Sequence, residues 1–574
     1  MILVFGGTTE GRKAVEVLEE AGSAYYYSTK TGEQDITLHH GERIDGALDG
    51  EAMLTFCRDH HIQLIVDAAH PFALQLHQTI ASVSESLQIP VVRYERIYLP
   101  RNPDFTWIDD YNQVPRNIHS LLATTGVQSI SKLKPLEAEG IKIIYRILNR
   151  ESSIESAHQQ GAADEQICFY PQTAQAEAVL MKESGLSGGF SEKVAEAQQK
   201  GMRIIVLKRP LLGFKHSVNG PYGLRRAIEQ LLPEFYPLHS GLTTGTCATA
   251  AAVAQTIRIM KGDTPPVVPV ILPDGETIHV SVTYGDGYAS VFKEAGDDPD
   301  VTDGIEVRAS VEPSEQFEIL GGEGVGRFTL PGFDYPPGEA AINKAPREMI
   351  RQNLEQLSIK KCKLSIIISV PQGTEIALRT FNPRLGIEGG ISIIGVSGIV
   401  KPFSEEAFIN SIRKCMTVAK ASGANRVVIN SGGKSERFVK ALYPDLPQQA
   451  FVEYGNYIGE TLKIANELGI RRITLGVMLG KAVKLAAGNL DTHSRKSVMD
   501  KDFIKQMLHE ADCDIDISDI TLAREIWDKL PPEKLQDFAS AIIGHCADYC
   551  IPLLPDGELT ILLIDDGGRI LRQQ

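Results

Sequence analysis

A glycine turn between a short apolar strand and a helix is the first pattern in the chain that predicts chemistry. Residues 2–5 are apolar, glycines and threonines follow, and residues 12–21 carry apolar side chains at helical spacing. Glycine lets a backbone approach a phosphate, and the first N–H groups of a helix point at the anion. The pattern predicts a nucleotide cofactor site, although similar turns occur in α/β folds that bind no nucleotide. The expected cofactor-binding residues are Gly6, Gly7, Thr8, Thr9 and Glu10, with Thr8 replacing the second glycine of the GxGxxG fingerprint.

The end of the predicted second strand, residues 24–28, indicates which nicotinamide cofactor is used. Folds that bind NAD often place an acid there, which binds the ribose. This chain has Ser28, Thr29 and Lys30 instead. Two hydroxyls and a cation suit a 2′-phosphate, so we expect NADPH. Glu33 is close enough to keep NADH open, and a solvated polar loop is the alternative.

Two further strand ends carry side chains that suit an acidic ligand. The predicted strand 63–68 ends just before His70, where open α/β sheets bind ligands. We expect His70 to be catalytic, although a lone histidine is more often structural. Arg93 and Arg96 lie beside Tyr94 after the next strand, and guanidinium groups bind carboxylates. A solvated strand end is the alternative for both arginines.

The last third of the chain has a second series of glycine turns. From residue 391 onward, apolar strands alternate with helices, which predicts a parallel sheet with its turns on one rim. We expect a nucleotide-like ligand at this rim. The predicted strands are 391–394, 426–429, 450–453 and 472–477. The rim residues are Gly395, Ser397, Gly398, Asn430, Gly432, Gly455 and Asn456.

Two other segments of the second half have polar side chains that suit a ligand. Thr244 lies in a Ser/Thr/Gly stretch before an alanine-rich helix, which is a helix N-cap signal. The loop 488–496 brings together Asp491, His493, Arg495 and Lys496. A solvated cap is the alternative for this loop.

Composition restricts the class of protein. The chain has 574 residues and a formal net charge of −15, which argues against duplex nucleic acid as a partner. It has no apolar run of the roughly 18 residues that a membrane span needs, and we expect no signal peptide. The 8 cysteines are sparse, so we expect no disulfide framework and a cytoplasmic location. Cys546 and Cys550 are expected to be buried thiols, a metal pair is the alternative, and we predict no metal site.

The element pattern predicts α/β and α+β architecture in two domains. Residues 1–237 are expected to form two Rossmann-like βα subdomains, about 1–115 and 116–237, with a cleft between them. Two prolines at 233 and 237 mark the seam. Residues 238–574 are expected to combine a mixed strand and glycine-loop region with a βαβα parallel sheet at about 391–490.

Residues 1–237 resemble the precorrin-6A reductase family. The motifs GGTTEGR, VDAAHPFA, VVRYER, LLATTG, KESGLSGGFSEK and VLKRP occur in that family's order and spacing. The resemblance implies reduction of a ring double bond of a corrin precursor by a nicotinamide nucleotide. His70 is then the candidate proton donor, with water as the alternative. Residues 167–172 depart from the Gly-Pro-Phe-Ser type of segment found in relatives.

Residues 240–497 resemble the cobalt-precorrin-5B C1-methyltransferase family. The matching motifs are SGLTTGTCATAAA, AGDDPDVTDG, GGEGVGRFTLPG, GEAAINKAPREMI, ISIIGVSGIVKPFS and LDTHSRKS. The resemblance implies S-adenosylmethionine as methyl donor at the predicted rim. Val396 and Ser397 stand where relatives have two threonines. Residues expected to bind the macrocycle in the two halves are Arg93, Arg96, Thr244, Arg347, His493, Arg495 and Lys496.

The two resemblances imply consecutive steps of cobalamin synthesis on cobalt-corrin precursors. C1 methylation of cobalt-precorrin-5B gives cobalt-precorrin-6A, which the reductase converts to 6B. Two alternatives stay open: a non-catalytic tetrapyrrole carrier, and an NADPH reductase fused to a transferase with another substrate. The sequence leaves the oligomeric state and any handover of the intermediate undecided.

Overall fold

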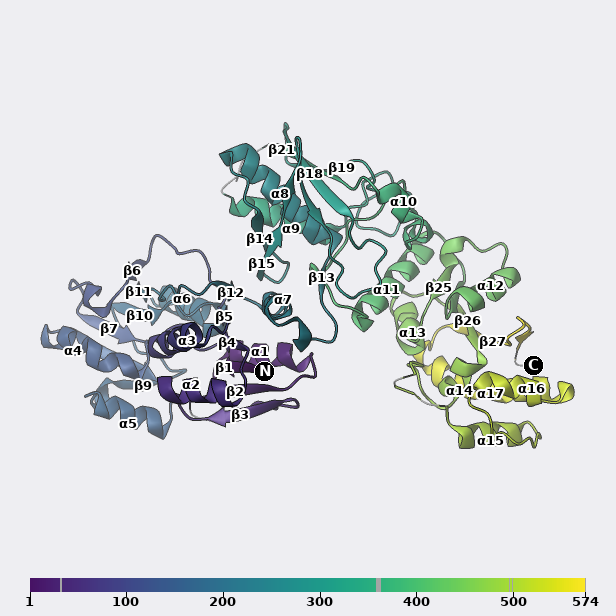
Figure 1. Cartoon of the computed structure of the whole chain (residues 1–574), viewed down its shortest axis with the longest axis horizontal. Helices are drawn as coiled ribbons and strands as arrows, with labels where there is room; N and C mark the ends of the chain where they lie inside the picture. The colour runs from purple at the N-terminus through teal and green to yellow at the C-terminus, as the bar shows by residue number, and fades with distance from the viewer. Residues whose placement is uncertain (31–33, 358–362, 495, 498, 573–574) are drawn as a thin grey trace. The chain divides into compact units, whose positions relative to one another are not determined.

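The computed structural model describes residues 1–30, 34–357, 363–494, 496–497 and 499–572 (Figure 1). The chain folds into two compact units. Unit 1 consists of Met1–Ser240 together with Pro269–Val280. Unit 2 consists of Gly241–Val268 together with Ser281–Gln574. A short segment beyond residue 240 is therefore part of unit 1.

The first sheet of unit 1 has six parallel strands in the order β12-β5-β4-β1-β2-β3. Helices α1 (Thr9–Glu19) and α7 (Pro221–Leu231) pack on one face. Helices α2 (Gly50–Asp59) and α3 (Leu74–Leu87) pack on the other. Because helices cover both faces, the central strands β1 and β4 are buried along their whole length and almost entirely apolar. The strands are β1 (Ile2–Phe5), β2 (Tyr25–Thr29), β3 (Gly41–Asp45), β4 (Leu64–Asp67), β5 (Val91–Tyr94) and β12 (His216–Val218).

The second sheet of unit 1 also has six parallel strands, in the order β6-β11-β10-β7-β8-β9. They are β6 (Thr106–Ile108), β7 (Ser120–Ala123), β8 (Lys142–Ile147), β9 (Ile167–Phe169), β10 (Ala178–Lys182) and β11 (Arg203–Leu207). The helices are α4 (Ile130–Ala138), α5 (Glu151–Gln159) and α6 (Phe190–Gln199). β6 comes directly after strands of the first sheet in sequence but pairs in the second sheet. β12 comes after the strands of the second sheet but pairs in the first. The sheets therefore exchange edge strands, and a division at about residue 115 does not separate them.

The N-terminal part of unit 2 packs the long helix α8 (Thr244–Lys261) against a mixed five-stranded sheet. The sheet order is β16-β17-β18-β21-β19, and only the β19–β21 pair is parallel. Alanines and threonines make the first three turns of α8 narrow enough to be completely buried. The strands are β16 (Thr283–Tyr284), β17 (Ala289–Phe292), β18 (Glu306–Pro313), β19 (Glu318–Gly321) and β21 (Leu364–Ser369), and α9 (Lys344–Gln356) packs beside α8.

The C-terminal part of unit 2 contains the expected parallel sheet, in the order β25-β24-β26-β27-β28. Its strands are β24 (Val427–Asn430), β25 (Phe451–Glu453), β26 (Arg472–Met478), β27 (Glu558–Ile564) and β28 (Ile570–Leu571), of which β28 is antiparallel. Its helices include α11 (Glu405–Ala421), α12 (Gly433–Leu442), α13 (Ile458–Glu467), α14 (Leu479–Ala486), α15 (Lys501–Glu510) and α17 (Leu535–Cys550). The predicted strands at 426–429, 450–453 and 472–477 are confirmed.

The predicted strand 391–394 is not part of that sheet. Ile391 and Ile393 form only isolated bridges, to Val325 and Ile342. Gly390 packs so closely on Gly324 that an added Cβ would lie 2.2 Å from a backbone oxygen. This close approach holds the segment in the glycine-rich region of unit 2. The parallel sheet takes its fourth parallel strand from β27 instead.

The fold class is mixed α/β, with two parallel sheets in the N-terminal half and mixed sheets in the C-terminal half, as predicted. Among the described residues, none of the helices is both long enough and apolar enough to cross a membrane. Cys546 and Cys550 are completely buried in the core around α17, which confirms that they are buried thiols. Within the described ranges, no group of three or more His, Cys, Asp or Glu side chains is placed to hold a metal ion.

Candidate functional site

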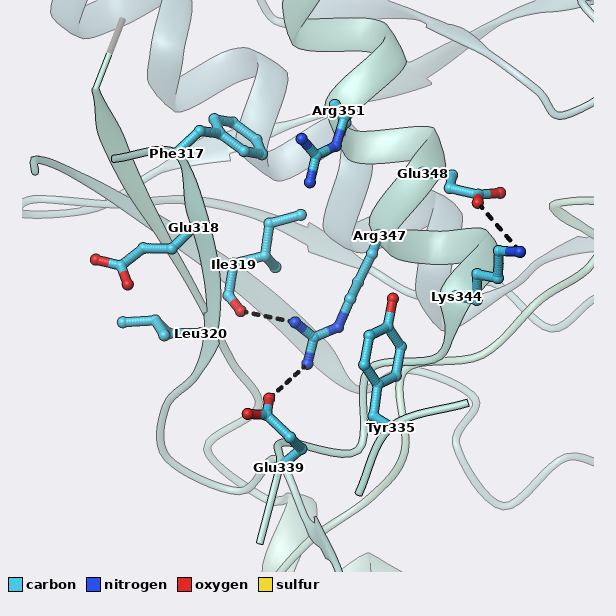
Figure 2. A pocket seen from close by; sticks show the side chains of 10 residues that line it. All are labelled: Phe317, Glu318, Ile319, Leu320, Tyr335, Glu339, Lys344, Arg347, Glu348 and Arg351. Atoms are coloured by element: carbon cyan, nitrogen blue, oxygen red, sulfur yellow. Dashed lines mark hydrogen bonds and ion pairs between the residues drawn. The ribbon is translucent and has the colours of Figure 1, made fainter. Parts of the chain in front are cut away.

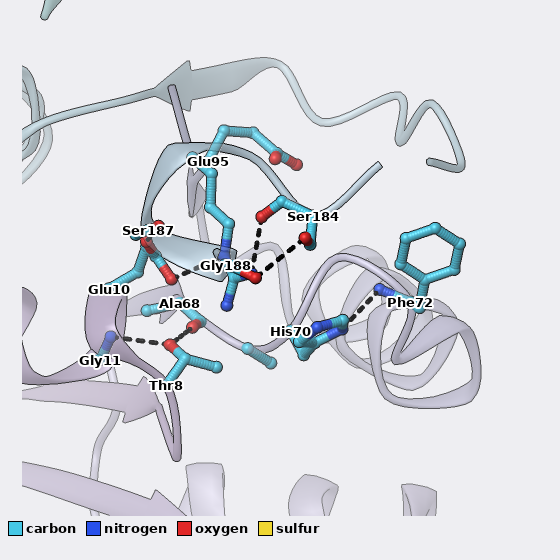
Figure 3. Close-up of polar contacts among 12 residues, drawn as sticks. Thr8, Glu10, Gly11, Ala68, His70, Phe72, Glu95, Ser184, Ser187 and Gly188 are labelled. Atoms are coloured by element: carbon cyan, nitrogen blue, oxygen red, sulfur yellow. Dashed lines mark hydrogen bonds and ion pairs between the residues drawn. The ribbon is translucent and has the colours of Figure 1, made fainter. Parts of the chain in front are cut away.

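The carboxyl ends of β1, β4, β5 and β10 meet in unit 1 and bring several predicted residues together (Figure 3). Thr8 is the N-cap of α1: its hydroxyl accepts a hydrogen bond from Gly11 N at 3.0 Å and donates to Ala68 O at 2.7 Å. The hydroxyl therefore fixes the start of α1 against the end of β4. Thr8 holds the turn in shape, which a glycine at this position would not do.

The glycines of the first turn have two different roles. A Cβ on Gly6 would lie 2.1 Å from the Tyr27 hydroxyl, so this glycine makes room for a buried ring. Gly7 has φ +81°, and open space surrounds the place where its Cβ would be. Its N–H donates to the Tyr27 hydroxyl at 3.1 Å and to Gln34 Oε1 at 3.2 Å. Gly7 is thus accessible to a ligand that takes the place of the Gln34 side chain.

Glu10 and Arg96, predicted to contact different ligands, form an ion pair with each other. Arg96 Nε lies 2.9 Å from Glu10 Oε2, and both side chains are buried. Arg96 also donates to Ser184 O at 2.7 Å, and Ser187 donates to Glu10. Ser184 and Ser187 follow β10, so this network joins the two sheets of unit 1.

Arg93 lies in a buried network rather than on an open surface. Its guanidinium contacts Asp67 at 2.9 Å and Glu95 at 2.8 Å, and it donates to two backbone carbonyls. Asp67 also contacts His77 Nδ1 at 2.6 Å. Only 1% of Arg93 is exposed. These contacts fix the ends of β4 and β5 and leave the guanidinium little access to a macrocycle carboxylate.

His70 follows β4 and is uncharged at neutral pH. Burial, followed by the charges of Arg96, Lys182, Arg93 and Lys193, lowers its pKa to about 3. Its Nδ1 accepts a hydrogen bond from Phe72 N at 3.2 Å (Figure 3), so the ring proton is assigned to Nε2. His70 is consequently a hydrogen-bond donor through Nε2 rather than an acid.

Two lysines that the sequence reasoning did not single out share these surroundings. Lys182 ends β10, and Lys193 lies on α6. Burial and the charges of Lys132 and Lys193 lower the pKa of Lys182 to about 8. Burial and arginine charges also lower the pKa of Lys193. In the described part of the chain, no carboxylate forms an ion pair with either lysine. Both lie in the motif KESGLSGGFSEK, so this motif was the one feature of the sequence that could have pointed to them.

The residues expected near a 2′-phosphate lie at the end of β2. Ser28 and Thr29 are buried, and Thr29 Oγ1 donates to Asp45 Oδ1 at 3.0 Å. Arg43 pairs with the same carboxylate at 2.9 Å. Lys30 is exposed and precedes residues 31–33, so the position of Glu33 lies outside the described residues.

Thr244 and the turn Gly395–Gly398 form a separate structural cluster in unit 2. Thr244 Oγ1 accepts from Ile394 N at 2.9 Å and is buried. A Cβ on Gly395 would lie 2.3 Å from Thr243 Oγ1. Ser397 Oγ donates to Ile399 O at 3.0 Å, whereas Val396 is exposed. Gly395, Ser397 and Gly398 therefore secure the start of α8 and do not join the rim of the parallel sheet.

The other predicted rim residues do meet at the carboxyl edge of the parallel sheet. Asn430 Oδ1 accepts from Gly432 N at 2.9 Å, and Asn430 O accepts from Tyr454 N at 2.8 Å. Lys481 at the start of α14 donates to Gly455 O, and burial lowers its pKa to about 8. Asn456 O accepts from Thr492 N at 3.0 Å. The loops after β24, β25 and β26 are thus tied together.

The loop 488–496 is held by ion pairs. Lys496 Nζ lies 2.7 Å from Glu405 and 3.0 Å from Asp491, and these carboxylates raise its pKa. Asp491 also accepts from His493 N at 3.0 Å. Arg495 lies outside the described residues. The charge of Lys496 is already balanced, which weakens its assignment to the macrocycle.

Arg347 lines a pocket of about 460 Å³ between α9 and β19 (Figure 2). Its guanidinium donates to Ile342 O at 2.9 Å and to Ile319 O at 3.3 Å, pairs with Glu339 at 3.4 Å, and stacks over Tyr335. Figure 2 shows Ile319, Glu339 and Tyr335 around the guanidinium. Arg347 therefore fastens α9 to the neighbouring strand and loop, with few donors left for a ligand.

The chain is an α/β protein in which glycine turns and buried charged side chains meet at the carboxyl edges of parallel sheets. Residues 1–230 match the family described as precorrin-6x reductase CbiJ/CobK, and residues 233–402 match the family CbiD. The chain belongs to the cobalt-precorrin-5B C(1)-methyltransferase family and carries a precorrin-6x reductase domain ahead of it. It is a cobalamin biosynthesis enzyme with C1-methyltransferase and precorrin-6x reductase activities.

Two curated methyltransferases illustrate the similarity. The cobalt-precorrin-5B C(1)-methyltransferase of Prosthecochloris aestuarii is 40% identical over 350 residues, which cover 58% of this chain and 95% of the relative. The enzyme of Brucella anthropi is 44% identical over 285 residues, covering 48% of this chain and 77% of the relative.

Two solved structures also align with the chain. The cobalamin biosynthesis protein CbiD from Archaeoglobus fulgidus is 30% identical and covers 45% of this chain and 83% of its own, with a TM-score of 0.27. A CobK precorrin-6A reductase is 15% identical and covers 40% of this chain and 96% of its own, with a TM-score of 0.34.

Proposed function

We propose that the hydride donor is NADPH, bound in unit 1, and that the methyl donor is S-adenosylmethionine, bound in unit 2. NADPH supplies a hydride when bound, and S-adenosylmethionine supplies a methyl group. We interpret the sheets of unit 1 as two Rossmann-like subdomains with the reductase cleft between them, and the C-terminal sheet of unit 2 as the methyl-donor fold. The substrates are cobalt-precorrin-5B and cobalt-precorrin-6A.

The observation that carries the reductase site is that, among the described residues, no carboxylate forms an ion pair with Lys182 or Lys193, although burial lowers the pKa of both. Half-buried cations without a carboxylate partner are costly, and an anionic ligand removes that cost. A corrin precursor presents carboxylates, which suit these two lysines. Arg93 and Arg96, by contrast, already have carboxylate partners and hold the site in shape.

Proton supply in the reduction follows from the two pKa shifts. At neutral pH His70 has no imidazolium proton to give, because its pKa is about 3. Lys182 is protonated below its pKa of about 8, so its ammonium group is the better acid at pH 7. We assign the proton to Lys182, and the positioning of the ring to His70 through its Nε2–H. Phe72 links the two, since the Lys182 ammonium lies 5.1 Å from its ring centroid and the His70 ring 5.9 Å from it.

The turn after β1 fits a nucleotide phosphate. Gly7 is open on its outer side, and Thr8 fixes the helix start behind it. A phosphate that takes the Gly7 N–H replaces Gln34 as its partner. Lys30, exposed at the end of β2, suits the 2′-phosphate of NADPH. Lys30→Glu is therefore expected to shift the ratio of kcat/KM for NADPH and NADH toward NADH, and an unchanged ratio would reject this assignment.

The rim of the parallel sheet in unit 2 fits the methyl donor. Gly432 has φ +111°, and open space surrounds the place where a Cβ on Gly433 would be, so a ligand can approach the start of α12. Asn430 holds the turn through Gly432 N, and Asn456 and Gly455 border the same edge. Methyl transfer is an in-line displacement, so these residues act by positioning the reactants and excluding water.

Both reactions act on the same corrin precursor in succession, with methylation first. Placing the two units in one chain keeps the reductase site close to the site where the methylated intermediate forms. A short flexible linker gives an effective concentration of about millimolar. Seven free cysteines among the described residues agree with a reducing, cytoplasmic setting.

Calorimetric titration of the full chain with each donor tests the proposal. We expect one site for NADPH and one for S-adenosylmethionine, with each donor binding equally well in the presence of the other. Competition between the donors, or failure of either to saturate, would contradict two separate sites.

A further inference from the structure

In the parallel sheet of unit 2, the order in which the chain adds strands reverses between β24 and β26. The chain runs from β24 outward to β25 and then returns past β24 to β26. α12 packs on one face of the sheet and α13 on the other. At such a point the loops after adjacent strands leave toward opposite faces, and open α/β sheets bind ligands in the crevice this creates.

Glu453 ends β25 directly beside Asn430, the last residue of β24. Its carboxylate lies over the turn after β24, since a Cβ on Gly432 would be 2.6 Å from Glu453 Oε1. Gly432 combines φ +111° with ψ −175°, a conformation available almost only to glycine. The turn is thus shaped so that its backbone passes directly beneath a carboxylate.

Among the described residues, the Glu453 carboxylate accepts no hydrogen bond, unlike its acidic neighbour Glu436. Glu436 pairs with Arg384 at 2.9 Å and with Lys440 at 2.6 Å. Throughout the described ranges, no side chain or backbone N–H donates a hydrogen bond to Glu453. Burial raises the pKa of this carboxyl, and the nearby charges of Arg384 and Lys481 offset only part of that effect. A half-buried acceptor at a sheet's carboxyl edge is therefore left for a donor from outside the chain.

We infer that Glu453 accepts hydrogen bonds from the ribose hydroxyls of the nucleoside bound over the Gly432–Gly433 turn. A ribose diol presents two adjacent donors, which match the two oxygens of a carboxylate. Glu453 follows Gly432 by about 20 residues, the separation at which dinucleotide folds place their ribose-binding acid. The inference rests on the proposed function, because it takes S-adenosylmethionine as the nucleoside.

Calorimetry with S-adenosylhomocysteine and its 2′-deoxy analogue tests the inference on the full chain. The wild type is expected to bind the ribose form about 10- to 100-fold more tightly than the deoxy form, the range for a hydrogen bond to a charged group. Glu453→Gln is expected to weaken binding of the ribose form by a similar factor and to lose most of this discrimination. Its thermal unfolding midpoint should not fall, because the glutamine removes a poorly compensated charge.

Glu460→Gln is the matched control, since Glu460 is partly exposed on α13 and, among the described residues, forms an ion pair with Lys463 alone. It should bind both ligands as the wild type does. If Glu453→Gln still bound the ribose form more tightly than the deoxy form by the wild-type factor, the inference would be overturned. The proposal that S-adenosylmethionine is the methyl donor would then still stand. Equal weakening of both ligands, with discrimination intact, would indicate a structural role and overturn it as well. If the wild type bound neither ligand, the proposed donor site would fall and the inference with it.

Discussion

Lys182 and His70 show how shared surroundings give two side chains different roles. Burial and neighbouring cations lower the pKa of both groups, to about 8 for Lys182 and about 3 for His70. At pH 7 the lysine therefore keeps its charge and the histidine has lost its own. The same local field thus makes one group an acid and the other a neutral hydrogen-bond donor.

Lys182→Gln tests this division at the level of one residue. In the wild type, kcat/KM for the reduction should fall as pH rises through about 8, because the free enzyme then loses the Lys182 proton. Removing a general acid typically costs about 100-fold or more in rate. The variant should show that loss and lack the inflection. Initial rates from pH 6 to about 9.5, a range chosen to bracket that pKa, provide the measurement.

Lys142→Gln is the control for this experiment. Lys142 is exposed at the first residue of β8. It therefore lies at the amino ends of the strands, whereas Lys182 lies at the carboxyl ends of the same sheet. It should leave both the rate and the pH profile unchanged. An inflection near pH 8 that persists in Lys182→Gln would assign the ionisation to another group.

The pairing of individual charges was the part of the site that the sequence could not predict. Arg96 was expected to bind substrate and Glu10 to bind cofactor, because each follows a strand with a suitable motif. They pair with each other across 86 positions of sequence. Lys182 and Lys193 were overlooked because a lysine at the end of a strand or on a surface helix gives no sign of burial in the sequence. Tertiary packing alone determines that these two lysines are buried and lie near other cations.

The glycine turns are the elements on which both proposed donor sites depend. Gly432→Ala should destabilise unit 2 by about 1–3 kcal/mol, because φ +111° is strained for alanine. The new Cβ would also displace the Glu453 carboxylate 2.6 Å away, so binding of S-adenosylmethionine should be lost. Thermal unfolding and calorimetry on the same samples measure both effects.

Gly433→Ala is the matched control for the fold. It lies at the start of α12, where an added Cβ meets no atom within 4 Å. Alanine in a helix is more stable than glycine, so unit 2 should keep or gain stability. Equal unfolding temperatures for the Gly432→Ala variant and the wild type would refute the strain argument.

Elements with a clear hydrophobic period were predictable, and those defined by strand pairing were not. The strand 2–5 and the strands at β24, β25 and β26 follow from apolar runs bounded by turn residues. The strand at 391–394 has the same appearance but is captured by the glycine-rich segment around Gly324. The exchange of β6 and β12 between sheets depends on which edge is open, and local sequence carries no signal for it.

On the scale of the whole molecule, unit 1 depends on a segment from beyond its main stretch of sequence. Glu276 is 1% exposed and lies in the 269–280 segment of unit 1. Its carboxylate accepts from the backbone N–H groups of Tyr222 and Gly223 at the start of α7. The 269–280 segment therefore supplies the N-terminal cap of a helix in the reductase unit.

The stability of unit 1 should consequently depend on the charge of Glu276. Burial raises its pKa to about 7, above the ordinary glutamate value near 4.5, so the folded state holds the proton more tightly than the unfolded state. Stability is thus lost as pH rises from about 4.5 to about 7, by up to about 3 kcal/mol. Unfolding of the wild type and of Glu276→Gln between those values measures the slope. The variant should lack that part of the slope, and parallel curves would refute the assignment.

The central claim is that one chain performs methylation and reduction in succession with two separate donors. Incubating the full chain with cobalt-precorrin-5B, followed by mass spectrometry of the macrocycle, tests it most directly. With S-adenosylmethionine alone the macrocycle should gain one methyl group, and with NADPH alone it should not change. With both donors it should gain one methyl group and two hydrogen atoms. A gain of hydrogen without prior methylation, or no gain of hydrogen with both donors present, would contradict the account.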